Sequence, residues 1–247
     1  MYVSVDSLPE LTPEYQQAKQ QAVRDAKVVY QFEVVKVSPT DYGTIFIWSL
    51  FGIGSLWLVW NALSDGFLGA LLLLIFSGGV LTYFYYAGNP DVKQTVTLTE
   101  KGMIVSDLQL VPDACFAALR YSGYVGIAIS VVGVVLVGPM MFIGAGAGLL
   151  MSFKMAGVEN RPKTRVRPFH PDIEYVMADN PCAKFKNSLF LREVIPNIEL
   201  ENDGGIKDEL FSRNQEFYFL TYASTEQQQE EIMGHLKKFI NVEKGDY

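Results

Sequence analysis

Three long stretches without any Asp, Glu, Lys or Arg dominate the sequence: residues 44–63, 66–87 and 121–153. A helix needs about 20 mainly apolar residues to cross the roughly 30 Å of hydrocarbon in a bilayer. A soluble domain of ordinary size has no use for three such uncharged stretches. They predict an integral membrane protein.

Composition narrows the function of the polar remainder. The net charge of -7 argues against general affinity for nucleic acid. The sequence has no Gly-rich phosphate loop and no zinc-ligand spacing, so we expect no cofactor. Cys115 and Cys182 are predicted to be free thiols of a reducing compartment, with one disulfide as the alternative.

The first two apolar stretches are separated only by Ser64 and Asp65, which predicts an antiparallel helical hairpin. The third stretch, 121–153, would be about 50 Å long as one straight helix, too long for an ordinary span. Gly138 and Pro139 lie at its middle, and proline removes a backbone donor, so we expect a break there. Two short helices or a re-entrant pair fit this stretch better than one helix, and the number of crossings stays open.

Positive charges predict the orientation. Basic residues precede the first stretch, lie between the second and third, and follow the third, whereas the turn at 64–65 has none. Cytoplasmic loops carry an excess of Lys and Arg, so all three basic regions should be cytoplasmic. This requires an even number of crossings in each membrane insert. We therefore expect both termini in the cytoplasm, in what we interpret as a bacterial inner membrane.

The aqueous residues predict a small β-rich domain interrupted twice by membrane segments. A helix is expected from Thr12 to about Lys27, and an amphipathic helix capped by Ser224-Thr225 is expected near the C-terminus. Alternating apolar residues predict strands at 28–37, 94–99, 103–107, 173–178, 188–194, 197–201 and 216–222. This element order resembles that of a pleckstrin-homology-like barrel. The predicted fold is thus an α+β membrane protein divided into 1–43 (helix and strand), 44–87 (transmembrane hairpin), 88–120 (β-hairpin), 121–153 (broken or re-entrant pair) and 154–247 (basic loop, strands and helix).

Small residues spaced four apart suggest close helix packing in the membrane. These residues are Gly126, Ser130, Gly144 and Gly148. Packing within one protomer, a homo-oligomer contact and a pore lining are the alternatives. The pore is least favoured, because no ionisable residue lies at membrane depth.

A basic segment follows the third apolar stretch. It contains Lys154, Arg161, Lys163, Arg165 and Arg167, opposed only by Glu159. Such clusters attract anionic lipid headgroups. The segment is either a topology signal alone or a contact for lipid or a partner protein.

Residues capable of catalysis are few. His170 and His235 are expected on the surface, and carboxylates such as Asp107 are expected to be solvated. On the last helix, Leu236, Phe239 and Ile240 form an apolar stripe that should dock on the sheet or on a partner.

We therefore expect a non-catalytic membrane subunit that self-associates or assembles with other proteins, anchored in membrane lipid and binding no nucleic acid. A secretion, conjugation, immunity or defence complex is the setting we infer from this class. A small oligomeric channel or transporter is the alternative.

Overall fold

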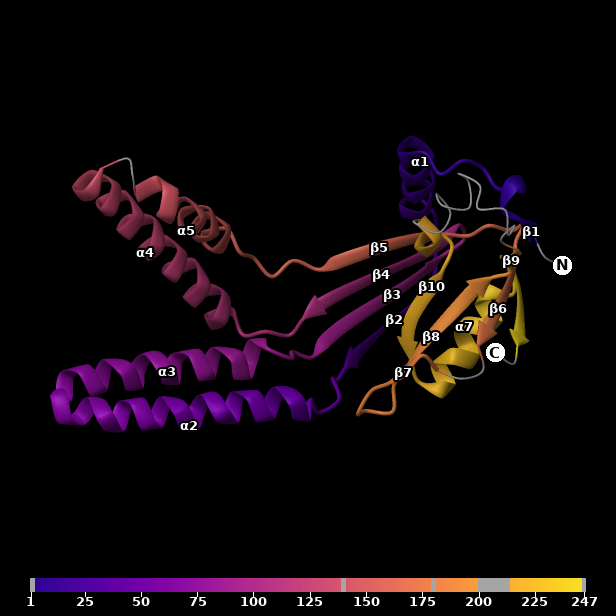
Figure 1. Ribbon diagram of the computed structural model, residues 1–247. Helices are drawn as coiled ribbons and strands as arrows, with labels where there is room; N and C mark the ends of the chain where they lie inside the picture. Colours follow the sequence, from indigo (N-terminus) through magenta and orange to yellow (C-terminus); the bar gives the residue numbers. More distant parts are fainter. Residues whose placement is uncertain (1–2, 139–140, 179–180, 200–213, 246–247) are drawn as a thin grey trace. The chain divides into compact units, whose positions relative to one another are not determined.

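The computed structural model describes residues 3–138, 141–178, 181–199 and 214–245, which fold into two compact units (Figure 1). The sheet unit comprises Met1–Pro39, Val92–Leu108 and Pro162–Tyr247. The helical unit comprises Thr40–Asp91 and Gln109–Arg161. The chain therefore leaves the sheet unit twice and returns to it twice.

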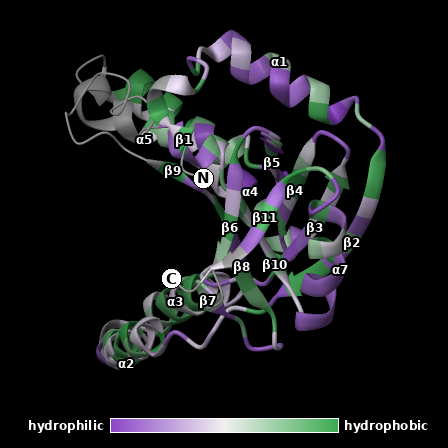
Figure 2. Cartoon of the chain, turned by 90° about the vertical axis from the view of Figure 1, so that its right-hand side faces the viewer, coloured by the Kyte–Doolittle hydropathy of each residue, from purple (hydrophilic) through white to green (hydrophobic). Residues whose placement is uncertain are grey.

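Helices α2 (Tyr42–Asp65) and α3 (Phe67–Ala87) form the first hairpin of the helical unit. The Asp41 side chain accepts a hydrogen bond from the Thr44 amide at 3.1 Å and caps α2. Gly66 links the helices with a φ of 154°, a conformation that L-residues with side chains rarely adopt. Nearly all apolar side chains of this hairpin are exposed, and Figure 2 draws α2 and α3 largely in its hydrophobic colour.

Helices α4 (Asp113–Val137) and α5 (Met141–Ala156) form the second hairpin. The chain turns at Gly138, where φ is 90°, and Pro139 lies outside the described residues. Helix α4 begins eight residues before the apolar stretch, so its first turns carry Asp113 and Arg120. By length and composition, three helices of the described chain could cross a membrane: Tyr42–Ser64, Phe67–Ala87 and Asp113–Leu136.

All four connections between the sheet unit and the helical unit begin or end at a strand of one four-stranded antiparallel sheet. Its strands are β2 (Val28–Lys36), β3 (Val92–Thr99), β4 (Gly102–Gln109) and β5 (Lys163–Pro168), in that order. Strand β2 leads into α2, α3 leads into β3, β4 leads into α4, and α5 leads into β5. The interpretation of 163–168 as a loop is wrong, because these residues pair with β4 from Lys163 opposite Asp107 to Pro168 opposite Gly102.

The second sheet has the order β10-β8-β6-β11, with β7 also paired to β8. Its strands are β6 (Glu174–Ala178), β7 (Ala183–Lys184), β8 (Phe190–Pro196), β10 (Leu220–Ser224) and β11 (Asn241–Gly245). A short parallel pair joins β1 (Val3–Ser4) to β9 (Ile198–Glu199). A 3-10 turn, η1 (Val5–Ser7), follows β1, and another, η2 (Gln215–Phe217), occupies the start of the strand expected at 216–222.

Two helices belong to the sheet unit. Helix α1 (Pro13–Arg24) begins at the expected Thr12 cap, whose hydroxyl accepts from the Tyr15 amide at 3.2 Å. Helix α7 (Glu226–Leu236) begins with a capping box made by Thr225 and Gln228. It does not end the domain as expected, because β11 follows it and pairs in parallel with β6. The pleckstrin-homology-like barrel stays a prediction.

The core of the sheet unit draws on both sheets and on α7. Its fully buried side chains include Leu98, Met103, Tyr175, Tyr222 and Leu236. Gly102 is required by a close approach, since a Cβ at this position would lie 2.5 Å from the Arg167 carbonyl oxygen and 2.6 Å from Val23. Glycine at this position therefore allows strand β5 and helix α1 to pack closely against the β3–β4 turn.

Candidate functional site

The small residues expected to pack helices divide into two groups. A Cβ on Gly126 of α4 would lie 2.3 Å from the Ser152 hydroxyl of α5, so this glycine permits close packing within one protomer. The hydroxyl of Ser130 donates back to the Gly126 carbonyl at 2.8 Å. A Cβ on Gly148 would meet nothing within 4 Å, and Gly144 lies in the part of α5 whose side chains are not described. Among the described glycines of this set, Gly148 has open space around it, so a contact with a second copy at Gly148 stays a prediction.

Ion pairs neutralise much of the predicted basic segment. Arg161 pairs with Glu159 at 2.8 Å, Arg167 pairs with Glu216 at 3.2 Å, and Arg165 pairs with Asp107. Lys154 and Lys163 have no ion-pair partner among the described residues. The surface available to anionic lipid is thus smaller than five charges in the sequence suggest.

Asp107 of β4 accepts hydrogen bonds from side chains on all three of the other strands of the four-stranded sheet. Its Oδ1 atom accepts from Lys36 Nζ of β2 and from Gln94 Nε2 of β3, both at 2.7 Å. Its Oδ2 atom accepts from the Arg165 guanidinium of β5. The Asp107 and Lys36 side chains are only 16% and 13% exposed, so the expectation of a solvated carboxylate is wrong.

The electrostatics of Asp107 favour its ionised form. Burial raises the pKa of the carboxyl, but hydrogen bonds from Lys36 and Gln94 and the charges of Lys36 and Arg165 outweigh burial. The pKa of Asp107 therefore lies below its ordinary value of 3.8. The carboxylate is a stable anion that holds together the four strands connected to the helical unit.

Gln94 extends this network to the second sheet. Its side chain is 1% exposed, and its Oε1 atom accepts from the Ala223 amide of β10 at 2.6 Å. The side-chain amide of Gln94 therefore links the Asp107 carboxylate to the backbone of β10. Sequence analysis missed this residue; the available signal was a glutamine at an inward position of an alternating strand.

The residues predicted to form an apolar stripe on the last helix lie in the sheet unit, but their placement on the helix is wrong for two of them: α7 ends at Leu236, and Phe239 and Ile240 belong to the turn before β11. Leu236 is 0% and Ile240 is 4% exposed, and Phe239 is half-buried and stacks on Phe169 with ring centroids 6.3 Å apart. Tyr30 of β2 donates to the Glu231 carboxylate of α7 at 2.6 Å and stacks on His235. This hydrogen bond raises the pKa of Tyr30 to about 12.

His170 is buried, and its interpretation as a surface residue is wrong. Its ring lies 4.6 Å from that of Tyr218 and 5.7 Å from that of Phe217, and its Nε2 atom has no hydrogen-bond partner in the described chain. Burial, reinforced by the charge of Lys19, lowers the pKa of His170 to about 4. The imidazole is therefore neutral at pH 7.

This burial predicts an acid-sensitive sheet unit. Below pH 6.5 the unfolded chain takes up the His170 proton first, so stability falls progressively until the pH reaches about 4. The shift from 6.5 corresponds to a loss of about 3 kcal/mol. His170→Phe should remove this loss, measured as the difference in unfolding midpoint between pH 7.5 and 4.5. Equal differences for both proteins would contradict the assignment.

Within the described chain, no three His, Cys, Asp or Glu side chains gather as metal ligands would. Cys115 and Cys182 are free thiols, and Cys182 lies on the surface. The described residues instead form ion pairs, buried aromatic clusters and apolar helices.

Comparison with known proteins shows the family to which this chain belongs. A family model described as TsiV2 immunity protein matches residues 13–243. The match covers both sheets and both helical hairpins, so the chain belongs to the TsiV2 immunity protein family. Its biological setting is therefore immunity, one of the settings expected from the sequence.

A particular relative is the Immunity protein TsiV2 of Vibrio cholerae, which is 33% identical over 88 residues. That alignment covers 36% of this chain and 32% of the relative, so the chain matches about a third of the length of this curated protein. No solved structure matches.

Proposed function

We propose that this chain is an integral membrane immunity protein that protects its own cell by binding a cognate toxin, without catalysis. The observation that carries the proposal is the family match over 13–243, which spans three helices long and apolar enough to cross a bilayer. An immunity protein neutralises a toxin, and one anchored in the membrane is placed to meet a toxin that acts at or crosses that membrane.

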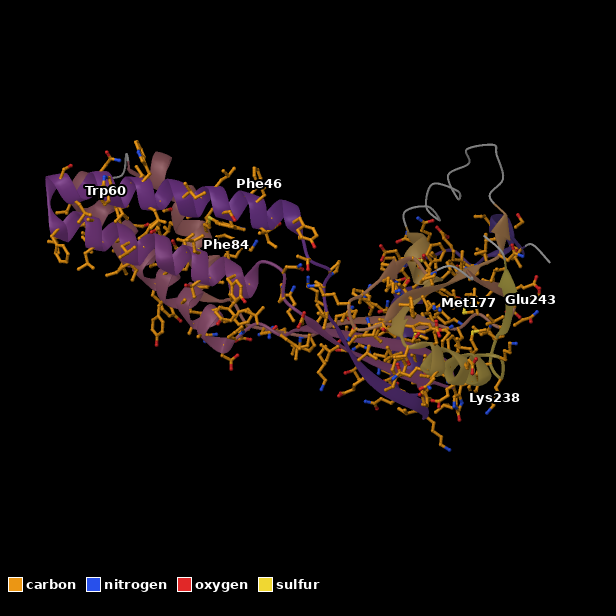
Figure 3. All side chains as sticks on the ribbon, turned by 90° about the horizontal axis from the view of Figure 1, so that it is seen from below. Phe46, Trp60, Phe84, Met177, Lys238 and Glu243 are labelled. Atoms are coloured by element: carbon orange, nitrogen blue, oxygen red, sulfur yellow. The ribbon has the colours of Figure 1, made fainter. Side chains whose placement is uncertain are left out.

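Exposed side chains support the membrane anchor. Trp57 and Trp60 near the α2–α3 turn are 65% and 76% exposed, and Tyr85 at the other end of the hairpin is 81% exposed. Figure 3 shows Phe46 and Trp60 at separate places along α2, while Phe84 of α3 stacks on Trp48 with ring centroids 4.1 Å apart. Aromatic residues at both ends of an apolar hairpin are typical of membrane interfaces.

Strand pairing supports an even number of crossings in each insert. The α2–α3 hairpin leaves from β2 and returns to β3, and these strands are hydrogen-bonded neighbours. The α4–α5 hairpin likewise leaves from β4 and returns to its neighbour β5. This pairing supports hairpins that begin and end on one side of the membrane, as the distribution of positive charge also predicts.

The two hairpins differ in the length of their shorter helix. Helices α2 and α3 have 24 and 21 residues, enough for about 30 Å. Helix α5 has 16 residues, or about 24 Å, which is short for a full crossing. We infer a full transmembrane hairpin for α2–α3 and, for α4–α5, a pair whose depth is limited by α5 although α4 has 25 residues, with the sheet unit in the cytoplasm.

Single cysteines test this orientation. In a chain with Cys115→Ser and Cys182→Ser, a membrane-impermeant thiol reagent should label Ser64→Cys from outside intact cells. Glu159→Cys and Lys101→Cys should be labelled only after permeabilisation. External labelling of Glu159→Cys would overturn the orientation.

The function itself is tested with the producing strain. Cells that lack this chain should be killed by siblings that retain the intact toxin system, and expression of the full chain should restore survival. Survival of the deletion strain beside toxin-producing siblings would rule out a role in immunity.

A further inference from the structure

Strand β11 and the turn that joins it to α7 border an open groove on the sheet unit. The groove has a volume of about 890 Å³ and is lined by residues 237–243 and by Pro171. It therefore follows the turn from α7 into β11 and the first half of that strand. Figure 3 shows Lys238 and Glu243 toward the margin of the sheet unit, away from the central Met177.

Strand β11 offers a free edge beside this groove. It is the last strand in the order β10-β8-β6-β11. In the part of the chain that the structure describes, its backbone makes no hydrogen bond beyond its ladder with β6. An exposed edge of this kind is a template for adding another strand.

Other sheet edges are less available. Asn187 and the Lys186 amide donate to the carbonyls of Val35 and Val37 along β2, and Gln94 occupies the Ala223 amide of β10. Strand β5 carries Lys163 and Pro168, residue types that blunt an edge against pairing. The edge of β11, in contrast, has a groove beside it.

Three charged side chains line the groove: Lys237 and Lys238 at its α7 end and Glu243 on β11, so the positive charge is concentrated beside the end of α7. Lys237 and Lys238 are exposed and have no ion-pair partner among residues 3–138, 141–178, 181–199 and 214–245. Both follow the last turn of α7, where cations also favour the helix dipole. The dipole accounts for positive charge at this point but not for the groove or the free strand edge beside it.

We propose that the cognate toxin adds an extended acidic segment to β11, with carboxylates opposite Lys237 and Lys238. This proposal rests on the proposed function. Main-chain hydrogen bonds to β11 supply affinity, the two lysines supply charge selection, and Phe239 and Pro171 supply an apolar floor. A lipid headgroup would use the lysines but not the backbone edge.

Synthetic peptides test the chemistry of the groove. A labelled nine-residue peptide alternating valine or threonine with glutamate should bind the detergent-solubilised full chain, followed by fluorescence anisotropy. The same peptide with lysine in place of glutamate should bind at least tenfold more weakly. N-methylation of alternate backbone nitrogens should abolish binding. Equal binding of the N-methylated peptide would overturn strand addition, since charge alone would then suffice.

Matched charge-reversal variants test whether the peptide binds beside Lys237 and Lys238. Lys237→Glu with Lys238→Glu should weaken the glutamate peptide at least tenfold, whereas Lys101→Glu, an exposed lysine on the β3–β4 turn, should not. In the sibling-killing assay the double variant should lose protection while Lys101→Glu retains it. If the wild-type chain protects and the double variant protects equally, this surface is excluded while the immunity function stands. If the wild-type chain fails to protect, the proposed function itself fails.

Discussion

Replacing Leu236 by Asp should unfold the sheet unit while leaving the helical unit folded. Leu236 is 0% exposed and lies in the core that α7 shares with both sheets. Deleting a buried leucine side chain costs about 2–5 kcal/mol, and the new carboxyl adds the cost of burying a polar group. Domains are stable by only about 5–15 kcal/mol, so one such change removes much of the total.

Hydrogen exchange measured segment by segment in detergent checks this result. Exchange should rise across β2, β8 and β10 as well as α7, with α2 and α3 as the internal reference. Gln227→Asp adds the same charge at an exposed position of the same helix and should leave exchange unchanged. An increase confined to α7 would show that the helix contributes little to the core.

Helices were predicted from the sequence better than the sheets. The apolar stretches fixed α2 and α3 to within about two residues, because an uncharged run of this length has few alternatives. The capping residue Thr12 located the start of α1, and the pair Ser224-Thr225 located the start of α7, whose cap is Thr225. These signals are local, so one sequence suffices to interpret them.

Strand β5 shows why the rest was harder. Its residues Lys163, Thr164 and Arg165 are polar, so its sequence has no apolar alternation over the first half. It is a strand because β4 lies beside it after an insertion of more than 50 residues. Strand β11 similarly depends on its pairing with the distant β6. Long-range pairing of this kind leaves little trace in local composition.

Buried polar residues were missed for a related reason. Asp107, Gln94 and His170 each resemble surface residues when considered alone. Gln94 and His170 are buried, and Asp107 is half-buried, because partners distant in sequence surround them: Lys36 and Arg165 for Asp107, Ala223 for Gln94, and Tyr218 for His170. The candidate groove at β11 also depends on β11 being a sheet edge, which only the strand order reveals.

Asp107→Ala should destabilise the four-stranded sheet by about 3 kcal/mol. The substitution leaves the Lys36 ammonium, 13% exposed, without its carboxylate, and it removes the acceptor for Gln94. Removing one partner of a buried ion pair is costly because the remaining charge stays desolvated. The unfolding midpoint of the sheet unit, measured by exchange of β3 and β4, should fall accordingly.

Two further variants separate burial from charge. Glu33→Gln breaks the ion pair between Glu33 and Lys93 on the same sheet, whose side chains are 52% and 41% exposed. This variant should change the unfolding midpoint little, because water screens both charges. Asp107→Leu combined with Lys36→Met replaces the buried pair by apolar side chains and should recover most of the stability lost in Asp107→Ala. If the double variant is as unstable as Asp107→Ala, the contribution of Asp107 lies in its bonds to Gln94 and Arg165. The carboxylate would then act by joining β3 and β5, whose outer ends receive the chain from the two hairpins, rather than by neutralising Lys36.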